Sequence, residues 1–220
     1  IATTVSGTLA GVDPIFLLSS LPFTAKDFDD VRKLWEIARP HYEAVFEKYG
    51  QKLIHAGWID PSGIWANKEI AAVEDLENLR IRTYDATGTR VLNALNASPL
   101  QISWSDVVPQ LATGSISAVL TGVDGGAASN FWDYTNTFTQ INYAMPLTFV
   151  HLNLETYNAL PEDLKDAVMQ AGKEATEWRA EQVRKNQAAK YEELRAHDMT
   201  VFESVDPAFA AKLSKAAQPI

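Results

Sequence analysis

Two long stretches of the chain repeat apolar side chains with the period of an α-helix. In residues 27–49 apolar positions recur every three or four residues, and Gly50 ends the pattern. Pro40 is expected to kink or divide this helix, because proline lacks the amide that a helical hydrogen bond needs. The second pattern covers residues 161–196, with a polar interruption at 184–187. At about 1.5 Å per residue this helix would be roughly 50 Å long, so we expect it to bridge two lobes.

Between these two helices, short strand and helix patterns alternate. Residues 79–84 alternate apolar and polar side chains, which is the period of a strand. The segments that follow are expected to be helices at 87–96, 105–112 and 127–134 and strands at 99–103, 116–120 and 141–154. Residues 122–126 are rich in glycine and are expected to form a flexible turn. This alternation predicts an α/β fold.

Composition and charge exclude several classes of function. The net charge of −9 disfavours a nucleic-acid-binding protein, because binding phosphates requires clustered Lys and Arg. The chain has no cysteine, which excludes a thiol nucleophile, a disulfide framework and a Cys-based metal site. No apolar run approaches the ~18 residues of a membrane-spanning helix. The chain begins with Ile1 rather than Met, so we expect that a preceding segment is missing, and a cleaved signal peptide would be one such segment.

The motifs of common enzymes are also missing. The sequence contains no nucleophile elbow, no P-loop and no glycine-rich dinucleotide motif. The histidines His41, His55, His151 and His197 lie far apart in the sequence, and none forms the helical pair that zinc sites often use. We therefore predict no catalytic residues, no metal site and no cofactor.

The segment Asp75-Leu76-Glu77-Asn78-Leu79-Arg80-Ile81-Arg82 is the most distinctive of five short motifs that follow one another over nearly the whole chain. In order and spacing these motifs resemble those of TRAP-type (tripartite ATP-independent periplasmic) solute-binding proteins, the DctP-like family, in which the corresponding segment reads D-L-K-G-L-K-I-R. The remaining four are Ser19-Ser20-Leu21-Pro22-Phe23 for D-L-P-F, Ala97-Ser98-Pro99 with Trp104-Ser105-Asp106-Val107 for G-A-x-P and W-x-E-V, Leu111-Ala112-Thr113-Gly114 for L-Q-T-G, and Leu160-Pro161-Glu162-Asp163-Leu164 for L-P-x-E-D. Each motif is weak alone, and the resemblance depends on their common order.

The resemblance implies a two-lobed fold like that of periplasmic binding proteins, with crossing strands, a long bridging helix and a ligand cleft between the lobes. The expected lobe I contains residues 1–58 and 146–186, and lobe II contains residues 59–145 and 187–220. The family also has a strand–helix–strand unit that would precede Ile1, and it usually continues beyond the last residue of this chain. We therefore expect part of lobe I to lie outside this sequence.

The resemblance also indicates which residue would hold the ligand. In the family, the Arg of the I-R pair forms a two-pronged salt bridge with the ligand carboxylate, and that position here is Arg82. The guanidinium fork matches a carboxylate and stays charged when buried. The alternative is an exposed strand Arg without a ligand, since Arg is seldom buried. We expect Arg80 and Arg90 to lie on the surface.

Aromatic residues are expected to line part of the cleft. Trp104 occupies the family's aromatic position at the cleft, and the alternative is a core Trp that caps the following helix. Further aromatics on loops or strand ends are expected to approach the cleft, namely Trp58, Trp65, Tyr84, Phe131 and Trp132. About half of the candidate aromatics are expected to pack in the core, because aromatic side chains are buried mostly for packing.

The expected ligand class depends on a departure from the family. Thr121 falls where many members have the Asn of D-G-Q-E-N, and Thr offers one hydroxyl where Asn offers both a donor and an acceptor. Gly125 and Gly126 leave room without side chains. A sugar acid would leave hydroxyl groups unpaired in such a site, at about 1–3 kcal/mol each. We therefore expect a compact or aromatic monocarboxylate rather than a sugar acid, and the identity of the ligand stays open.

Together these features predict the ligand-binding subunit of a TRAP transporter. Such a protein is not an enzyme; it is periplasmic, closes on a small organic acid and delivers it to membrane permease subunits. It neither spans the membrane nor binds nucleic acid. Two alternatives remain open, an extracytoplasmic sensory ligand-binding domain and an enzyme on a two-lobed α/β scaffold, because a fold alone does not fix a function.

Overall fold

The computed structural model describes residues 1–25 and 27–219, which form two compact units. Unit 1 contains Ile1–Leu21, Ala25–Ile59 and Met145–Lys185, and unit 2 contains Pro22–Thr24, Asp60–Ala144 and Asn186–Ile220. Apart from Pro22–Thr24, the chain passes between the units within one residue of the three crossings that the sequence predicts. That these units are the two lobes of a ligand cleft stays a prediction.

Unit 1 is built on a three-stranded antiparallel sheet with the strand order β1-β8-β2. Its elements are β1 (Ala2–Val5), 3₁₀ helices at Ser6–Leu9 and Pro14–Ser20, α1 (Phe28–Lys48), β2 (Gln51–Trp58), β8 (Leu147–Asn153), α5 (Leu154–Asn158) and most of α6 (Glu162–Ala196). Helix α1 begins where the Asp27 side chain accepts a hydrogen bond from the Asp30 amide, 2.9 Å away.

Pro40 lies inside this helix, so the expected division there was wrong. The residue is exposed, and water can therefore bond the carbonyl that loses its helical partner.

An aromatic cluster forms the core of unit 1. Phe149 of the central strand β8 lies 4.8 Å from Tyr42 and 5.5 Å from Phe46 of α1, measured between ring centroids. Phe16, from the second 3₁₀ helix, lies 5.7 Å from the same Phe149 ring. All four side chains are buried, so the removal of their apolar surface from water holds α1 on the sheet.

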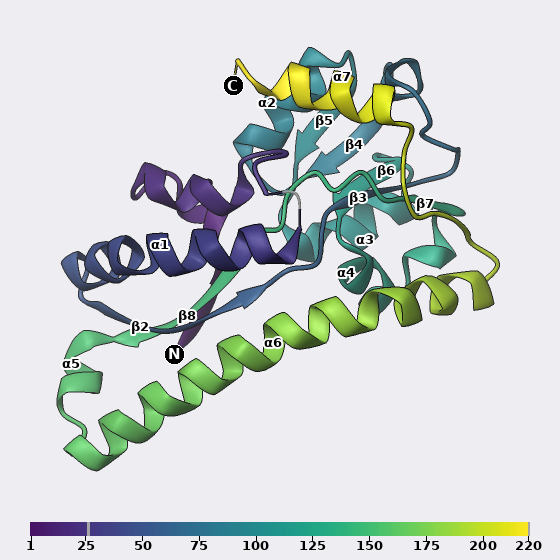
Figure 1. Cartoon of the computed structure of the whole chain (residues 1–220). Coiled ribbons are helices and arrows are strands. Elements are labelled where there is room, and N and C mark those ends of the chain that lie inside the picture. The colour runs from purple at the N-terminus through teal and green to yellow at the C-terminus, as the bar shows by residue number, and fades with distance from the viewer. Residues whose placement is uncertain (26, 220) are drawn as a thin grey trace. The chain divides into compact units, whose positions relative to one another are not determined.

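Unit 2 is built on a six-stranded mixed sheet with the strand order β5-β4-β6-β3-β7-β9. In chain order its elements are β3 (Gly63–Ala66), a 3₁₀ helix at Val73–Leu76, β4 (Arg80–Thr83), α2 (Ala86–Ala94), β5 (Ser98–Gln101), α3 (Trp104–Ala112), β6 (Ala118–Thr121), α4 (Val123–Ala128), a 3₁₀ helix at Phe131–Asp133, β7 (Thr137–Thr139), the end of α6, β9 (Thr200–Phe202) and α7 (Pro207–Ala217). Strand β4 pairs in parallel with both β5 and β6 (Figure 1). The carboxyl ends of these three strands therefore lie along one edge of the sheet.

Residues 122–126 form most of a helix rather than the flexible turn that their glycines suggested. Helix α4 begins at Val123, the second residue of this segment, and ends at Ala128. The helix expected at 127–134 was therefore wrong in its bounds, since only a 3₁₀ helix at Phe131–Asp133 follows α4 there. The reason is close packing, because a Cβ atom on Gly126 would lie 2.2 Å from ring atoms of the buried Trp65. Glycine lets the backbone of α4 lie against β3, and this contact is invisible in the local sequence.

The long strand expected at 141–154 is shorter in the structure. Strand β8 covers only Leu147–Asn153, and the residues between β7 and β8 have no regular structure. Asn142 has a φ of 50°, in the left-handed region that a strand does not use. Pro146 has no amide to donate to a ladder, so the strand begins only after it.

Helix α6 is the long green helix of Figure 1, and it continues without a break for 35 residues from unit 1 into unit 2. This confirms the long helix that the sequence predicts. In unit 1 it packs closely on β2, because a Cβ atom on Gly172 would lie 2.5 Å from the carbonyl oxygen of Ile54. The Nε of Arg179 also donates a hydrogen bond to the carbonyl oxygen of Trp58, at 3.0 Å. Among the helices formed by residues 1–25 and 27–219, none is both long and apolar enough to cross a membrane.

Replacing Gly172 with Ala should destabilise the protein, although this change inside a helix usually stabilises it by up to about 1 kcal/mol. The added methyl group would press on the carbonyl oxygen of Ile54, and overpacking of this kind typically costs about 1–3 kcal/mol. Urea titrations would give the free energy of unfolding. The exposed neighbour Ala171 provides the control, because Ala171→Gly should lose only the ~1 kcal/mol of helix propensity. A Gly172→Ala variant more stable than the wild type would contradict the close packing of α6 on β2.

Candidate functional site

Arg82 lies near the end of strand β4 and is buried, with 5% of its surface exposed. Its Nε donates a hydrogen bond to the carbonyl oxygen of Ile102, 2.9 Å away, just after β5. Burial lowers the pKa of the guanidinium to about 10, and electrostatic interactions with the neighbouring Tyr84 and Asp85 oppose this shift. Arg82 therefore stays positively charged at neutral pH, whereas Arg80 on the same strand is exposed, as expected.

The Arg82 guanidinium has aromatic neighbours instead of an acidic partner. Its Cζ lies 5.4 Å from the ring centroid of Trp104 and 6.0 Å from that of Tyr84. Such rings attract a cation through their negative faces. In the part of the chain that the structure describes, no carboxylate forms an ion pair with Arg82. The two terminal nitrogens are therefore available to a ligand carboxylate.

Trp104 is the first residue of α3, and 45% of its surface is exposed. The alternative of a core Trp was therefore wrong for this residue. A Cβ atom on Gly125 would lie 3.3 Å from Cη2 of Trp104 and 3.3 Å from Oγ1 of Thr121, the last residue of β6. Arg82, Tyr84, Trp104, Thr121 and Gly125 thus gather beyond the carboxyl ends of β4, β5 and β6. Ligands of open α/β sheets commonly bind at such an edge.

Two other predicted aromatics have packing roles in unit 2. Trp65 has no exposed surface and lies among Phe131 and Phe138, with ring centroids 5.5 Å and 5.0 Å away. The ring of Trp132 lies flat on His197, at 3.9 Å between centroids. These positions fit the expectation that part of the aromatic set would pack rather than contact a ligand.

Asp85 is a member of this region that the sequence reasoning missed. It is 1% exposed, and its Oδ1 accepts a hydrogen bond from the Gly88 amide at 2.8 Å, which caps helix α2. Burial raises the pKa of Asp85, while backbone hydrogen bonds from Gly88 and Thr87 and the charges of Arg82 and Arg90 lower it. An Asp placed directly before the helical pattern is a typical N-cap signal, and this signal would have located it.

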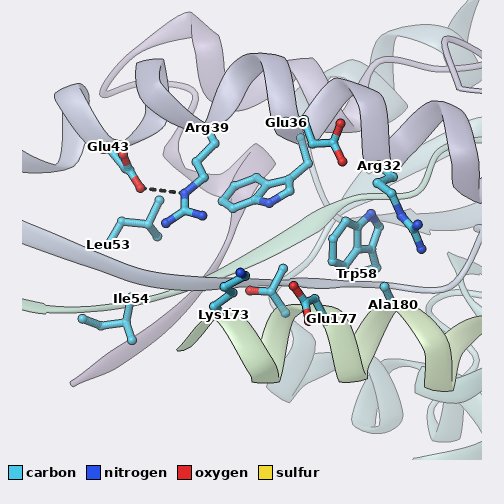
Figure 2. A pocket seen from close by; sticks show the side chains of 12 residues that line it. Arg32, Glu36, Arg39, Glu43, Leu53, Ile54, Trp58, Lys173, Glu177 and Ala180 are labelled. Carbon is cyan, nitrogen blue, oxygen red and sulfur yellow. Dashed lines mark hydrogen bonds and ion pairs between the residues drawn. The ribbon is translucent and has the colours of Figure 1, made fainter. Parts of the chain in front are cut away.

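Trp58 lies in a separate groove of unit 1, between α1, β2 and α6 (Figure 2). The groove has a volume of about 310 Å³, and Trp58 is almost fully buried on its floor. Side chains of both charges line it from the two helices, namely Arg32, Glu36, Arg39, Glu43, Lys173 and Glu177. Arg39 and Glu43 pair with each other at 2.7 Å. Because its positive and negative side chains are equal in number, the groove should attract an organic anion less strongly than the uncompensated charge of Arg82 does.

Within residues 1–25 and 27–219, no group of three or more His, Cys, Asp or Glu side chains is arranged to hold a metal ion.

The whole chain matches one family model. The family described as bacterial extracellular solute-binding protein, family 7 (DctP), matches residues 1–220. A solute-binding protein of Sulfitobacter sp. (strain NAS-14.1) is 24% identical over 203 residues, which are 89% of this chain and 60% of that protein. The chain thus spans less than two thirds of that curated relative.

Solved structures show the same fold. The crystal structure of DctP7, a Bordetella pertussis extracytoplasmic solute receptor binding pyroglutamic acid, is 28% identical with a TM-score of 0.94, and the match covers 99% of this chain and 72% of that one. A TRAP periplasmic solute-binding protein from Haemophilus influenzae with bound L-gulonate is 23% identical with a TM-score of 0.91, over 99% of this chain and 71% of that one. These likenesses confirm the α/β fold of two-lobed periplasmic binding proteins with a long helix.

Proposed function

Because the chain belongs to family 7 of the bacterial extracellular solute-binding proteins, we propose that it is the receptor of a TRAP transporter for a small organic acid. It works in the periplasm, binds the acid through a salt bridge from Arg82 and releases it unchanged to membrane permease subunits. The role is binding rather than catalysis.

A buried cation without an acidic partner among residues 1–25 and 27–219 carries this proposal. Burying a charge is costly unless the charge is paired, and Arg82 is 5% exposed, with only its Nε hydrogen-bonded to a described residue. A ligand carboxylate would supply the missing counter-charge with two parallel hydrogen bonds to the guanidinium fork. A strand end needed only for packing would be served better by an apolar side chain.

A compact ring acid suits the surroundings of Arg82 better than a sugar acid. Trp104 and Tyr84 offer flat apolar surface beside the guanidinium, and the missing side chain of Gly125 lets α4 lie close to Trp104. Thr121, at the end of β6, offers a ligand only one hydroxyl. The Bordetella pertussis receptor, at 28% identity, binds pyroglutamic acid, a small ring with one carboxylate. We infer that this protein binds pyroglutamate or a similar compact monocarboxylate.

Arg82→Ala should weaken binding of pyroglutamate by roughly thirty- to several-thousand-fold. This range corresponds to the about 2–5 kcal/mol that removing one partner of a buried charged pair costs. Isothermal titration calorimetry would measure the change in Kd, and thermal unfolding would establish that the variant is folded.

Arg80→Ala is the matched control, because Arg80 lies two residues away on the same strand and is exposed. Its Kd should change little. Equal and small effects of the two substitutions would show that Arg82 is not the anchor.

Pyroglutamate should bind at least about tenfold more tightly than galacturonate, a difference of about 1.4 kcal/mol. The extra hydroxyl groups of the hexuronate would lose water without finding partners, at about 1–3 kcal/mol each. The same calorimetry compares the two acids, and 2-pyrrolidinone, the same ring without the carboxylate, should give no measurable binding. Tighter binding of galacturonate would refute this ligand class.

A further inference from the structure

Asp85 is buried beside Arg82 but is not paired with it. Its Oδ1 is taken by the Gly88 amide, whereas Oδ2 is shielded from solvent and has no hydrogen-bond partner among the described residues. No direct ion pair joins Asp85 to Arg82, three residues earlier. Asp85 is thus a carboxylate held near the proposed ligand anchor without neutralising it.

The backbone amides of Gly88 and Thr87 stabilise the charge of Asp85, whereas two nearby tyrosines do not neutralise it. The hydroxyl of Tyr143 is also buried and has no hydrogen-bond partner in the described part of the chain, and the hydroxyl of Tyr84 is buried near Ser62. Burial is the main reason that the pKa of each tyrosine is raised, so both are neutral near pH 7. The cations that act on Asp85 are Arg82 from β4 and Arg90 from α2. Because Asp85 and Arg82 are buried, their charges interact more strongly than they would at the surface.

The ionisation of Asp85 therefore depends in part on the charge of Arg82. Burial raises the pKa of Asp85. The backbone hydrogen bonds from Gly88 and Thr87 lower this pKa most, and the positive charge of Arg82 lowers it next. A ligand carboxylate on Arg82 would cancel this stabilising charge and add a negative one nearby. The pKa of Asp85 should then be higher in the complex than in the free protein.

We propose that Asp85 tunes this site, taking up a proton when a ligand carboxylate pairs with Arg82 and weakening the binding when it stays ionised. The inference rests on the proposed function and assigns to Asp85 a role without ligand contact. The sign follows from linkage, because a group whose pKa rises on binding takes up protons. Affinity should then fall as pH rises from the pKa of Asp85 in the free protein to its pKa in the complex, and should level off on either side.

Asp85→Asn should remove this dependence while keeping the fold. Asn is as good an N-cap as Asp and preserves the acceptor for the Gly88 amide. The variant mimics the protonated acid, so above the titration range it should bind pyroglutamate about tenfold more tightly than the wild type. Tenfold corresponds to a pKa difference of about one unit, the low end for interacting charges. Asp206→Asn, at the N-cap of α7 in the same unit, is the matched control and should behave as the wild type.

Calorimetry of pyroglutamate binding tests the proposal directly. Titrations at one pH in two buffers of different ionisation enthalpy give the number of protons taken up, and the series runs from about pH 5 to about pH 8, where the free ligand stays ionised. We expect net proton uptake in the wild type and in Asp206→Asn but none in Asp85→Asn.

Two results would overturn the inference and leave the proposed function standing. One is tight binding by the wild type with no proton uptake at any pH in the series. The other is uptake that persists unchanged in Asp85→Asn. Failure of pyroglutamate and of every other carboxylate to bind would instead overturn both the inference and the proposed function.

Discussion

The charge of Arg82 is the constraint on which the organisation of unit 2 depends. A guanidinium that is 5% exposed must be oriented and partly compensated by the protein, or the fold would lose several kcal/mol. The Ile102 carbonyl fixes one edge through Nε, and the faces of Trp104 and Tyr84 stabilise the positive charge without neutralising it. The charge therefore keeps its capacity to attract an anion.

The sheet places these groups together although they are distant in sequence. Tyr84 follows β4, Ile102 and Trp104 follow β5, and Thr121 ends β6. Because the three strands run in parallel, all their carboxyl ends open at one edge, where Gly125 packs closely against Trp104 and Thr121. The neighbouring Asp85 has two roles, because it caps α2 and also influences the electrostatic environment of the same edge. One carboxylate therefore contributes both to the stability of the fold and to the properties of the site.

Sequence reasoning succeeded where the signal was periodic or held in a motif, and it failed where distant packing decides. The helical period predicted α6, and the I-R motif predicted the buried environment of Arg82. The glycines of 122–126 were wrongly taken as signs of a flexible turn. Gly126 is needed because its backbone packs against the ring of Trp65, which is distant in the sequence. Whether an aromatic at a strand end faces a core or a site also depends on its neighbours, so Trp65 and Trp104 looked alike in the sequence. The electrostatic role of Asp85 becomes visible only when its burial and that of Arg82 are known.

A crystal structure of the protein with bound pyroglutamate would test the central claim most directly. Our account predicts that the two carboxylate oxygens lie within hydrogen-bond distance of the two terminal nitrogens of Arg82, with the ligand ring against Trp104. The Nε of Arg82 should keep its bond to the Ile102 carbonyl. Ligand density that avoids Arg82, for example in the groove of unit 1 beside Trp58, would contradict it.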